Sequence, residues 1–191
     1  MDAAIANLRL ETERLVLREL HMEDADFLFQ EWSDPEVTRF MCDEDPLQKR
    51  EQAEEFLLQF ESPEKNPYLI WWGVERKANY HLIGTCGYFR WDQKHHRAEI
   101  GYDLCPDAWG HGLMLEVLRA IVRFGFDKMK LNRIEATVHI GNMRSQRVLR
   151  KLGFKQEGIL REYYCCNGIY NNQVQFSLLK REWLSEWFQP D

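Results

Sequence analysis

The residues with the clearest chemical potential in this sequence are two glycines, Gly110 and Gly112, separated by one residue. The segment Glu99–Leu104 before them carries apolar and aromatic side chains at alternate positions, and Pro106 ends this predicted strand because proline cannot donate to a sheet ladder. A helical pattern follows over Leu113–Phe126. Glycines let the backbone approach an anion, and a helix N-terminus offers free N–H groups and a positive dipole end. The segment therefore predicts a phosphate-binding loop, with a simple tight turn as the alternative.

A second segment brings an asparagine and a serine to the start of another helix. Asn142 is a favourable N-cap residue, Ser145 lies one turn later, and Gly153 suits the position after the helix end. The strand-like segment Arg133–His139 precedes this helix, and Phe154 leads into a further strand. The predicted order is therefore strand, Gly-x-Gly helix, strand, Asn-x-x-Ser helix and strand.

Further elements must hold these two helices in place. The sequence predicts an opening strand Leu10–Arg18, helices His21–Trp32 and Pro46–Phe60, strands Tyr68–Val74, Leu82–Trp91, Lys155–Tyr164 and Tyr170–Leu179, and an end helix Arg181–Phe188. It contains no repeat, low-complexity tract or internal linker. We therefore expect one domain over residues 1–191, with its core over residues 10–183.

Composition restricts the possible functions. The chain has 31 acidic and 25 basic residues and a net charge of −6, which argues against nonspecific nucleic-acid binding because such binding needs a basic surface. No segment approaches the roughly 20 apolar residues of a membrane span, and residues 1–7 lack the apolar run of a secretory signal. Five cysteines without a Cys-x-x-Cys pair fit free thiols in a reducing compartment. We expect a cytoplasmic protein that binds neither nucleic acid nor membrane.

The histidines and cysteines predict no metal site. His95 and His96 are adjacent, so they point to opposite sides of an extended chain, and no partner lies at ligand spacing. A thiol nucleophile at Cys105 or Cys165 stays open as an alternative, and the sequence assigns no role to the pair Cys165 and Cys166.

The order and spacing of these motifs resemble the acetyl-CoA core of the GNAT (GCN5-related N-acetyltransferase) superfamily. The segment Leu10–Arg18 is similar to the opening strand of that family. The segments Glu157–Arg161 and Asn167–Tyr170 are similar to the end of its RimJ/RimL-like branch, which acetylates the N-termini of ribosomal proteins. The resemblance covers roughly Leu10 to Trp183. It implies an α/β fold with a mixed, mostly antiparallel sheet of about seven strands and helices on both faces.

The resemblance also implies roles for individual residues. The phosphate loop would hold the pyrophosphate of acetyl-CoA, and the backbone of Asp103 and Leu104 would contact pantetheine and supply an oxyanion donor. Asn142 would reach the pantetheine arm, and Ser145 would assist the departing thiolate. The expected acetyl-CoA-binding residues are Asp103, Leu104, Trp109, Gly110, His111, Gly112, Leu113, Met114, Asn142 and Ser145.

Two positions depart from the family pattern. Many relatives carry Gln or Arg where this chain has Asp107, so a cation that could meet the phosphates is missing, and Arg147 or Arg150 would have to compensate. Relatives often carry Asp where this chain has Asn172, which puts in doubt any role of that carboxylate in holding the acceptor amine.

The base that accepts the proton of the amine is predicted from the residues at hand. Glu99 is the best carboxylate, because it lies on the strand that leads to the reacting carbonyl and could act through water; a surface residue or a partner of Arg97 is the alternative. The pKa of a protein α-amine is about 7.7–8.0 and that of lysine near 10.4, so a weak base suits an α-amine. The aromatic residues expected to line the acceptor slot are Trp72, Tyr88, Tyr163 and Tyr164, with core packing as the alternative.

These observations predict direct acetyl transfer from acetyl-CoA to a primary amine, without a metal. We expect the acceptor to be the N-terminal amine of a ribosomal or other protein that begins with Ser or Ala, since the net charge of −6 suits a basic tail. The alternatives are a small amine, such as a polyamine, amino acid or aminoglycoside, and a non-catalytic module that binds acyl-CoA. A monomer and a homodimer are both compatible with the sequence.

Overall fold

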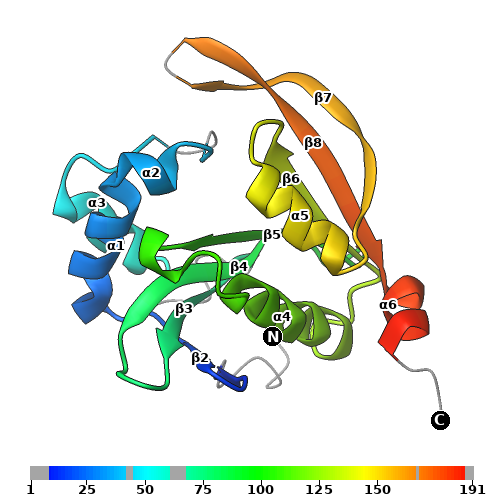
Figure 1. Ribbon diagram of the computed structural model, residues 1–191, viewed down its shortest axis with the longest axis horizontal. Helices are drawn as coiled ribbons and strands as arrows, with labels where there is room; N and C mark the ends of the chain where they lie inside the picture. The colour runs from blue at the N-terminus through cyan, green and yellow to red at the C-terminus, as the bar shows by residue number, and fades with distance from the viewer. Residues whose placement is uncertain (1–8, 42–44, 61–67, 167, 188–191) are drawn as a thin grey trace.

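Eight strands form one mixed sheet in the computed structural model, and the structure describes residues 9–41, 45–60, 68–166 and 168–187 (Figure 1). The sheet order is β1-β2-β3-β4-β5-β6-β8-β7, and every neighbouring pair is antiparallel except β5 and β6, which are parallel. The strands are β1 (Leu10–Glu11), β2 (Leu15–Arg18), β3 (Ile70–Arg76), β4 (Leu82–Asp92), β5 (Arg97–Leu104), β6 (Arg133–His139), β7 (Lys155–Cys166) and β8 (Ile169–Leu179). The helices are α1 (Ala25–Ser33), α2 (Pro35–Thr38), α3 (Arg50–Leu57), α4 (Leu113–Asp127), α5 (Met143–Lys151) and α6 (Lys180–Trp187).

The opening segment forms two strands where its sequence predicts one. Leu10 pairs with Leu17 across a turn, so β1 and β2 make a tight hairpin. Thr12 closes this turn, because its backbone N–H donates to the carbonyl of Leu15 at 3.0 Å and its hydroxyl oxygen accepts the N–H of Leu15 at 3.0 Å. The sheet therefore has eight strands and not about seven.

The first helices also differ in detail from the prediction. Helix α1 starts at Ala25 because residues 22–24 form a 3-10 turn, and α3 is shorter than the expected Pro46–Phe60. Helix α1 ends at Ser33, and Pro35 occupies the first turn of α2, where its missing N–H needs no partner. Among the described residues, none of the helices combines the length and the apolar content that crossing a membrane requires.

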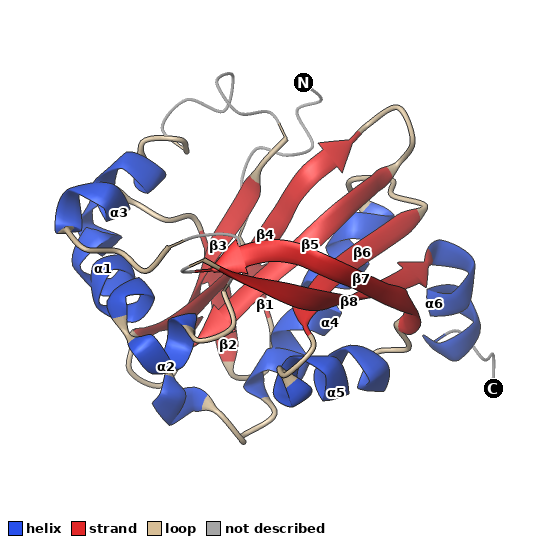
Figure 2. Ribbon diagram, turned by 90° about the horizontal axis from the view of Figure 1, so that it is seen from above, coloured by secondary structure: helices blue, strands red, loops and turns tan. Residues whose placement is uncertain are grey.

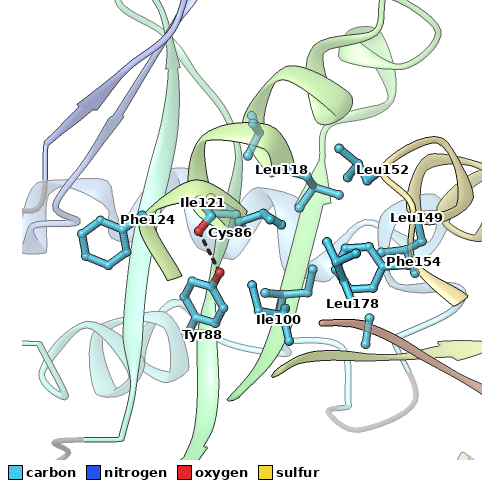
Figure 3. Packing of buried hydrophobic residues seen from close by; sticks show 14 of the residues in the cluster. Cys86, Tyr88, Ile100, Leu118, Ile121, Phe124, Leu149, Leu152, Phe154 and Leu178 are labelled. Atoms are coloured by element: carbon cyan, nitrogen blue, oxygen red, sulfur yellow. Dashed lines mark hydrogen bonds between the residues drawn. The ribbon is translucent and has the colours of Figure 1, made fainter. Parts of the chain in front are cut away.

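Helices α4 and α5 pack on the larger of two hydrophobic cores (Figure 3). The Tyr88 hydroxyl of β4 donates to the carbonyl of Ile121 in α4 at 2.7 Å, shown as a dashed line in Figure 3. Gly125 permits this close approach of helix and sheet, because an added Cβ would lie 2.3 Å from the Tyr88 hydroxyl oxygen. Other members of this core are Cys86, Ile100, Leu118, Phe124, Leu149, Leu152, Phe154 and Leu178.

Helices α1 and α3 pack on a second, smaller core, apart from α4 and α5 (Figure 2). Its buried members are Leu20, Ala25, Leu28, Ala53 and Leu57. Half-buried aromatic rings extend it toward the middle of the sheet, with Trp32 and Phe56 at 4.7 Å and Phe56 and Trp71 at 6.3 Å between ring centroids. Since successive side chains of a strand alternate between faces, Trp71 belongs to this core and Trp72 to the larger one.

The contact between β5 and β6 is short. Arg97, Ala98 and Glu99 pair with Arg133, Ile134 and Glu135. Within the described chain, β5 has no strand pairing with β6 after Glu99, although it stays paired with β4 as far as Leu104. Residues 100–104 therefore form an open edge in the middle of the sheet, and the phosphate loop and α4 follow this edge directly.

Strands β7 and β8 form a long hairpin that extends beyond the rest of the sheet in Figure 1. Their register shifts between Leu160 and Tyr164, which are paired with Gln173 and Asn171. Asn172, on the strand opposite this bulge, accepts the N–H of Glu162 at 2.8 Å through its side chain. The register shift is a β-bulge in β7 next to Tyr164, a feature that is common beside binding sites.

Candidate active site

The predicted phosphate loop has the backbone conformation that its glycines suggest. Gly110 and Gly112 have φ of +82° and +74°, in the left-handed region that favours glycine, and Gly112 is the N-cap residue of α4. No side chain caps the N–H groups in the first turn of α4 within the described residues. A Cβ added at Gly110 would meet no atom within 4 Å, so the loop is open on that side. Free N–H groups beside an open glycine loop can bind an anion.

The side chains that follow the loop point inward. Leu113 is buried and Met114 is half-buried, and both pack against the larger core. Their backbone N–H groups, and not their side chains, are therefore the groups of these two residues that can meet an anion.

Arg14, from the β1–β2 turn, holds the loop in place. Its guanidinium donates to the carbonyl of His111 at 3.0 Å and to the carboxylate of Glu116, in α4, at 2.7 Å. The same carboxylate also accepts the backbone N–H of Arg14 at 2.8 Å. The sequence analysis missed this contact, because nothing in the local pattern links residues so far apart in the chain.

A second cation lies against the loop on the side of α5. The guanidinium of Arg144 lies 4.3 Å from the ring centroid of Trp109, whose indole N–H donates to the carbonyl of Leu104 at 2.7 Å. Arg150, one of the two residues expected to replace the missing cation, instead lies over Phe176 at the other end of α5. Arg14 and Arg144 are therefore the cations whose contacts place them at the loop.

Asn142 and Ser145 lie together at the start of α5, as the motif predicts. The side chain of Asn142 accepts the backbone N–H of Ser145 at 3.1 Å and so acts as the N-cap. The hydroxyl oxygen of Ser145 lies 2.7 Å from the hydroxyl oxygen of Tyr102 on β5. Tyr102 is a residue that the sequence analysis did not select.

Glu99 is buried and has a cationic partner. Its carboxylate accepts a hydrogen bond from Arg90 at 2.9 Å, while Arg97, the partner considered from the sequence, pairs with Asp92 and Glu135. Arg90 lies at the irregular end of β4 with φ of +51°, and this conformation directs its guanidinium to Glu99.

Arg90 also connects Glu99 to the β7–β8 hairpin. Its guanidinium donates to the Tyr164 hydroxyl at 3.2 Å. Tyr163, the next candidate, is exposed and packs edge to face on Tyr164 with ring centroids 4.8 Å apart. Tyr164 is therefore linked to Glu99 through Arg90, and Tyr163 packs on the side of Tyr164.

Asp103 forms a buried carboxyl pair with Glu31 of α1. Asp103 accepts hydrogen bonds from the backbone N–H and the hydroxyl of Thr85, at 2.9 and 2.7 Å, and from the indole N–H of Trp32 at 3.4 Å. Burial, and then the neighbouring charge of Asp103, raise the pKa of Glu31 far above its usual range. Glu31 therefore keeps its proton at neutral pH, and we assign that proton to a hydrogen bond with Asp103, whose own pKa burial also raises.

Cys105 follows this pair and does not have the properties of a nucleophile. Its thiol lies 3.6 Å from the Glu31 carboxyl oxygen, and burial followed by the acidic neighbourhood raises its pKa. A reactive cysteine needs the opposite shift, because the thiolate is the nucleophile. The raised pKa therefore argues against a thiol nucleophile at Cys105.

Two of the expected acceptor residues lie in the wrong place. Trp72 and Tyr88 are both 0% exposed in the larger core, where Tyr88 bonds to α4, so neither can line an acceptor slot. Their neighbours Trp71 and Phe89 are half-buried on the opposite face, with ring centroids 6.4 Å apart. Trp71 lies over Gly101, because a Cβ added at Gly101 would come 2.6 Å from the Trp71 ring. This aromatic pair, between Glu99 and Asp103 along β5, replaces Trp72 and Tyr88 as the candidate acceptor surface.

Comparison with known proteins gives the class of this fold and site. A family model described as an acetyltransferase (GNAT) domain matches residues 14–155. YoaA of Bacillus subtilis (strain 168), named an uncharacterized N-acetyltransferase, is 40% identical over 171 residues, which are 90% of this chain and 96% of YoaA. YdaF of the same organism, named a putative ribosomal N-acetyltransferase, is 34% identical over 105 residues, 55% of this chain and 57% of YdaF.

A solved structure shows the same fold. Spermidine N-acetyltransferase from Vibrio cholerae, in complex with CoA and spermine, matches with a TM-score of 0.79 at 22% identity, over 90% of this chain and 98% of that chain. The fold and the family model define the class of protein: an acyltransferase that acts on amines. The chain belongs to the GNAT family of N-acetyltransferases, whose acetyl donor is acetyl-CoA.

Proposed function

We propose that this protein transfers the acetyl group of acetyl-CoA directly to the N-terminal amine of a protein, and that residues 1–191 act as one catalytic domain. The observation that carries the proposal is the junction of the open β5 edge with the uncapped start of α4. There one short stretch of chain offers a strand edge, a left-handed glycine loop and free helix N–H groups.

Each part of acetyl-CoA has a fitting partner at this junction. The loop from Trp109 to Met114 offers its N–H groups to the pyrophosphate, and Arg14 and Arg144 add positive charge beside it. The open edge of β5 up to Leu104 can pair with the amide groups of pantetheine as it would with another strand. The backbone N–H groups at this edge also suit the oxyanion of the tetrahedral intermediate.

The leaving group and the base follow from the same geometry. Ser145, at the start of α5 and across from β5, would donate a hydrogen bond to the departing thiolate, and Asn142 would contact the pantetheine arm. Glu99 would accept the proton of the amine through water. Arg90 already bonds to the Glu99 carboxylate, and a base that acts through water suits an acceptor whose amine loses its proton easily.

These features support an α-amine as the acceptor. The pKa of an α-amine is about 7.7–8.0, so a sizeable fraction is neutral near pH 7.5, whereas a lysine side chain is almost fully charged. The net charge of −6 favours approach of a basic protein tail, and YdaF is named for a ribosomal acceptor. We therefore propose ribosomal-protein N-termini beginning with Ser or Ala as acceptors, as in the RimJ/RimL-like branch, and a cytoplasmic site of action.

A small amine is the second candidate. The observation in its favour is the fold shared with the spermidine N-acetyltransferase of Vibrio cholerae. The aromatic pair Trp71 and Phe89 could hold a cationic amine as well as a peptide N-terminus, so the choice depends on the groups beyond the amine.

The test is a comparison of acceptors with the purified protein. Peptides that begin with Ser or Ala and continue with a basic tail are compared with the same peptides carrying a blocked N-terminus and with spermidine, and CoA release and the acetylated product are both measured. We expect acetylation of the free N-terminal peptides alone. Faster acetylation of spermidine or of the lysines in blocked peptides would reject the acceptor and keep the N-acetyltransferase. Acetyl-CoA binding by calorimetry without turnover of any amine would favour a binding module.

A further inference from the structure

Two hydroxyl groups meet across the open edge of β5. The phenolic oxygen of Tyr102, on β5, lies 2.7 Å from the hydroxyl oxygen of Ser145, on α5, which is the usual distance for a hydrogen bond between hydroxyl groups. Tyr102 lies beyond Glu99, the last residue of β5 that pairs with β6, and α5 follows β6 in the chain. The bond therefore connects the two parts of the sheet at the place proposed for the thioester.

The N-cap fixes the backbone of Ser145, whereas the direction of its hydroxyl group depends on Tyr102. The backbone N–H of Ser145 is held by Asn142 at 3.1 Å, so the position of its Cα is set by the N-cap. A serine hydroxyl rotates to suit its partners and carries one proton and two lone pairs. The direction of the Ser145 O–H therefore depends on the one side-chain bond that the structure gives it, which is the bond to Tyr102.

The chemistry of the two groups decides which one donates. The phenol is the more acidic hydroxyl, with an ordinary pKa of about 10, so it is the better donor. When Tyr102 donates to the oxygen of Ser145, the serine O–H is left free to donate to a third atom. In the opposite arrangement, the serine proton would be occupied and could not reach a sulfur atom.

We propose that Tyr102 is a positioning residue that accepts no proton and loses none, but orients the Ser145 hydroxyl so that its O–H donates to the sulfur of the departing CoA. This inference rests on the proposed function of Ser145. In the step concerned, the C–N bond forms and the C–S bond breaks, the electron pair stays on sulfur, and the serine O–H stabilises the thiolate. The proton of the amine goes to water and Glu99.

Tyr102 stays protonated during this step. The pKa of a free thiol is about 8.5, below that of a phenol, so the thiolate does not remove the phenolic proton. Burial of the ring raises the pKa of Tyr102 further, since the charged phenolate would lose solvation. The tyrosine therefore acts through the serine and does not act as the acid itself.

The test uses single hydroxyl deletions and a matched control. Tyr102→Phe removes the hydroxyl and keeps the ring, which packs against the larger core. Tyr88→Phe is the control, because it removes a phenol whose 2.7 Å hydrogen bond goes to the backbone of α4 inside the same core and not to Ser145. The kcat and the KM for acetyl-CoA are measured for both variants, for Ser145→Ala and for the double variant Tyr102→Phe with Ser145→Ala.

We expect Tyr102→Phe to lower kcat about fivefold, the worth of one hydrogen bond, with the KM for acetyl-CoA within about twofold of wild type. The double variant should match Ser145→Ala, because a residue that acts through the serine has no effect without it. Tyr88→Phe should keep the wild-type kcat.

Three results would overturn the proposal while leaving the proposed function standing. These are an unchanged kcat in Tyr102→Phe, a loss confined to the KM, and a double variant whose loss is the product of the two single losses. Absence of acetyl transfer to any amine by the wild-type protein is a different result, which would overturn the proposed function and this inference together.

Discussion

Replacement of Glu31 by glutamine should stabilise the protein, and the gain should grow as the pH rises. Burial and the charge of Asp103 raise the pKa of Glu31 above 7 in the folded state, whereas an unfolded chain ionises glutamate near pH 4.3. The folded state therefore binds one proton more than the unfolded state, so stability falls with rising pH through this window. Glutamine carries no such proton, and its amide can donate to Asp103 in place of the carboxylic acid.

The size of the effect follows from the pH window. Each pH unit above about 4.3 costs the wild-type fold about 1.4 kcal/mol, as long as the folded pKa of Glu31 lies above the pH. At pH 7 the cost is about 4 kcal/mol, and between pH 5 and pH 8 the difference between variant and wild type should change by about 4 kcal/mol.

Urea unfolding at pH 5, 6, 7 and 8 measures this difference. Glu116→Gln is the matched control. Burial alone would raise the pKa of Glu116, but hydrogen bonds from Thr12 and Arg14 lower it in the folded state. The ionised Glu116 therefore contributes its full stability above the pKa of glutamate in the unfolded chain, and this stability is lost only as the pH falls below that pKa. The control should therefore destabilise by a constant amount from pH 5 to pH 8. A Glu31→Gln difference that is also independent of pH would mean that Glu31 is ionised in the fold and would refute the reasoning.

Three further predictions concern the proposed reaction. Gly112→Val should weaken acetyl-CoA binding more than tenfold, about 1.4 kcal/mol, because a branched side chain at this left-handed position blocks the phosphate. Calorimetry measures the affinity, with Gly158→Val as the control, since a Cβ added at Gly158 has no atom within 4 Å. An affinity of Gly112→Val equal to that of the control would contradict the phosphate-loop role. Ser145→Ala should lower kcat about ten- to a hundred-fold with little change in the KM for acetyl-CoA, and a loss confined to the KM would contradict the role of the serine. Glu99→Gln should be most impaired at low pH and partly rescued above about pH 9, where an α-amine is neutral without a base; a pH–rate profile with an equal loss throughout would exclude Glu99 as the base.

The parts of the site that depend on local signals could be predicted from the sequence. The left-handed conformation of Gly112 and the cap that Asn142 places on Ser145 follow from residue types within a few positions of one another. The predicted start of α4 at Leu113 is confirmed, and it too depends on a local signal, the glycine just before the helix.

The sequence contains a signal that distinguishes Trp71 from Trp72, but the prediction of the acceptor residues did not use it. Ile70, Trp72 and Val74 put three large apolar side chains in succession on one face of β3, whereas Trp71 shares its face with Gly73 and the charged Glu75. A run of large apolar side chains on one face indicates the deeper face, so Trp72 belongs to the core and Trp71 to the more accessible side.

Contacts between distant segments could not be predicted. Two contacts of this kind are the pair of Glu31 with Asp103 and the hydrogen bond from Arg14 to His111. Both form only because the fold brings distant segments together, and no local pattern in the sequence indicates either contact. Each residue alone resembles an ordinary surface charge in the sequence. A buried carboxyl pair is visible only when the fold removes both groups from water.

The ladder of three residue pairs between β5 and β6 has a mechanical consequence. In the described chain, the ladder between β5 and β6 is shorter than the ladder of any other neighbouring pair of long strands, so the side chains packed on the sheet must also hold its two parts together. A donor bound along the open edge of β5 would supply the missing backbone partner for as long as it stays bound. The substrate would then be a temporary part of the architecture, and each release of CoA would return the enzyme to its more compliant form.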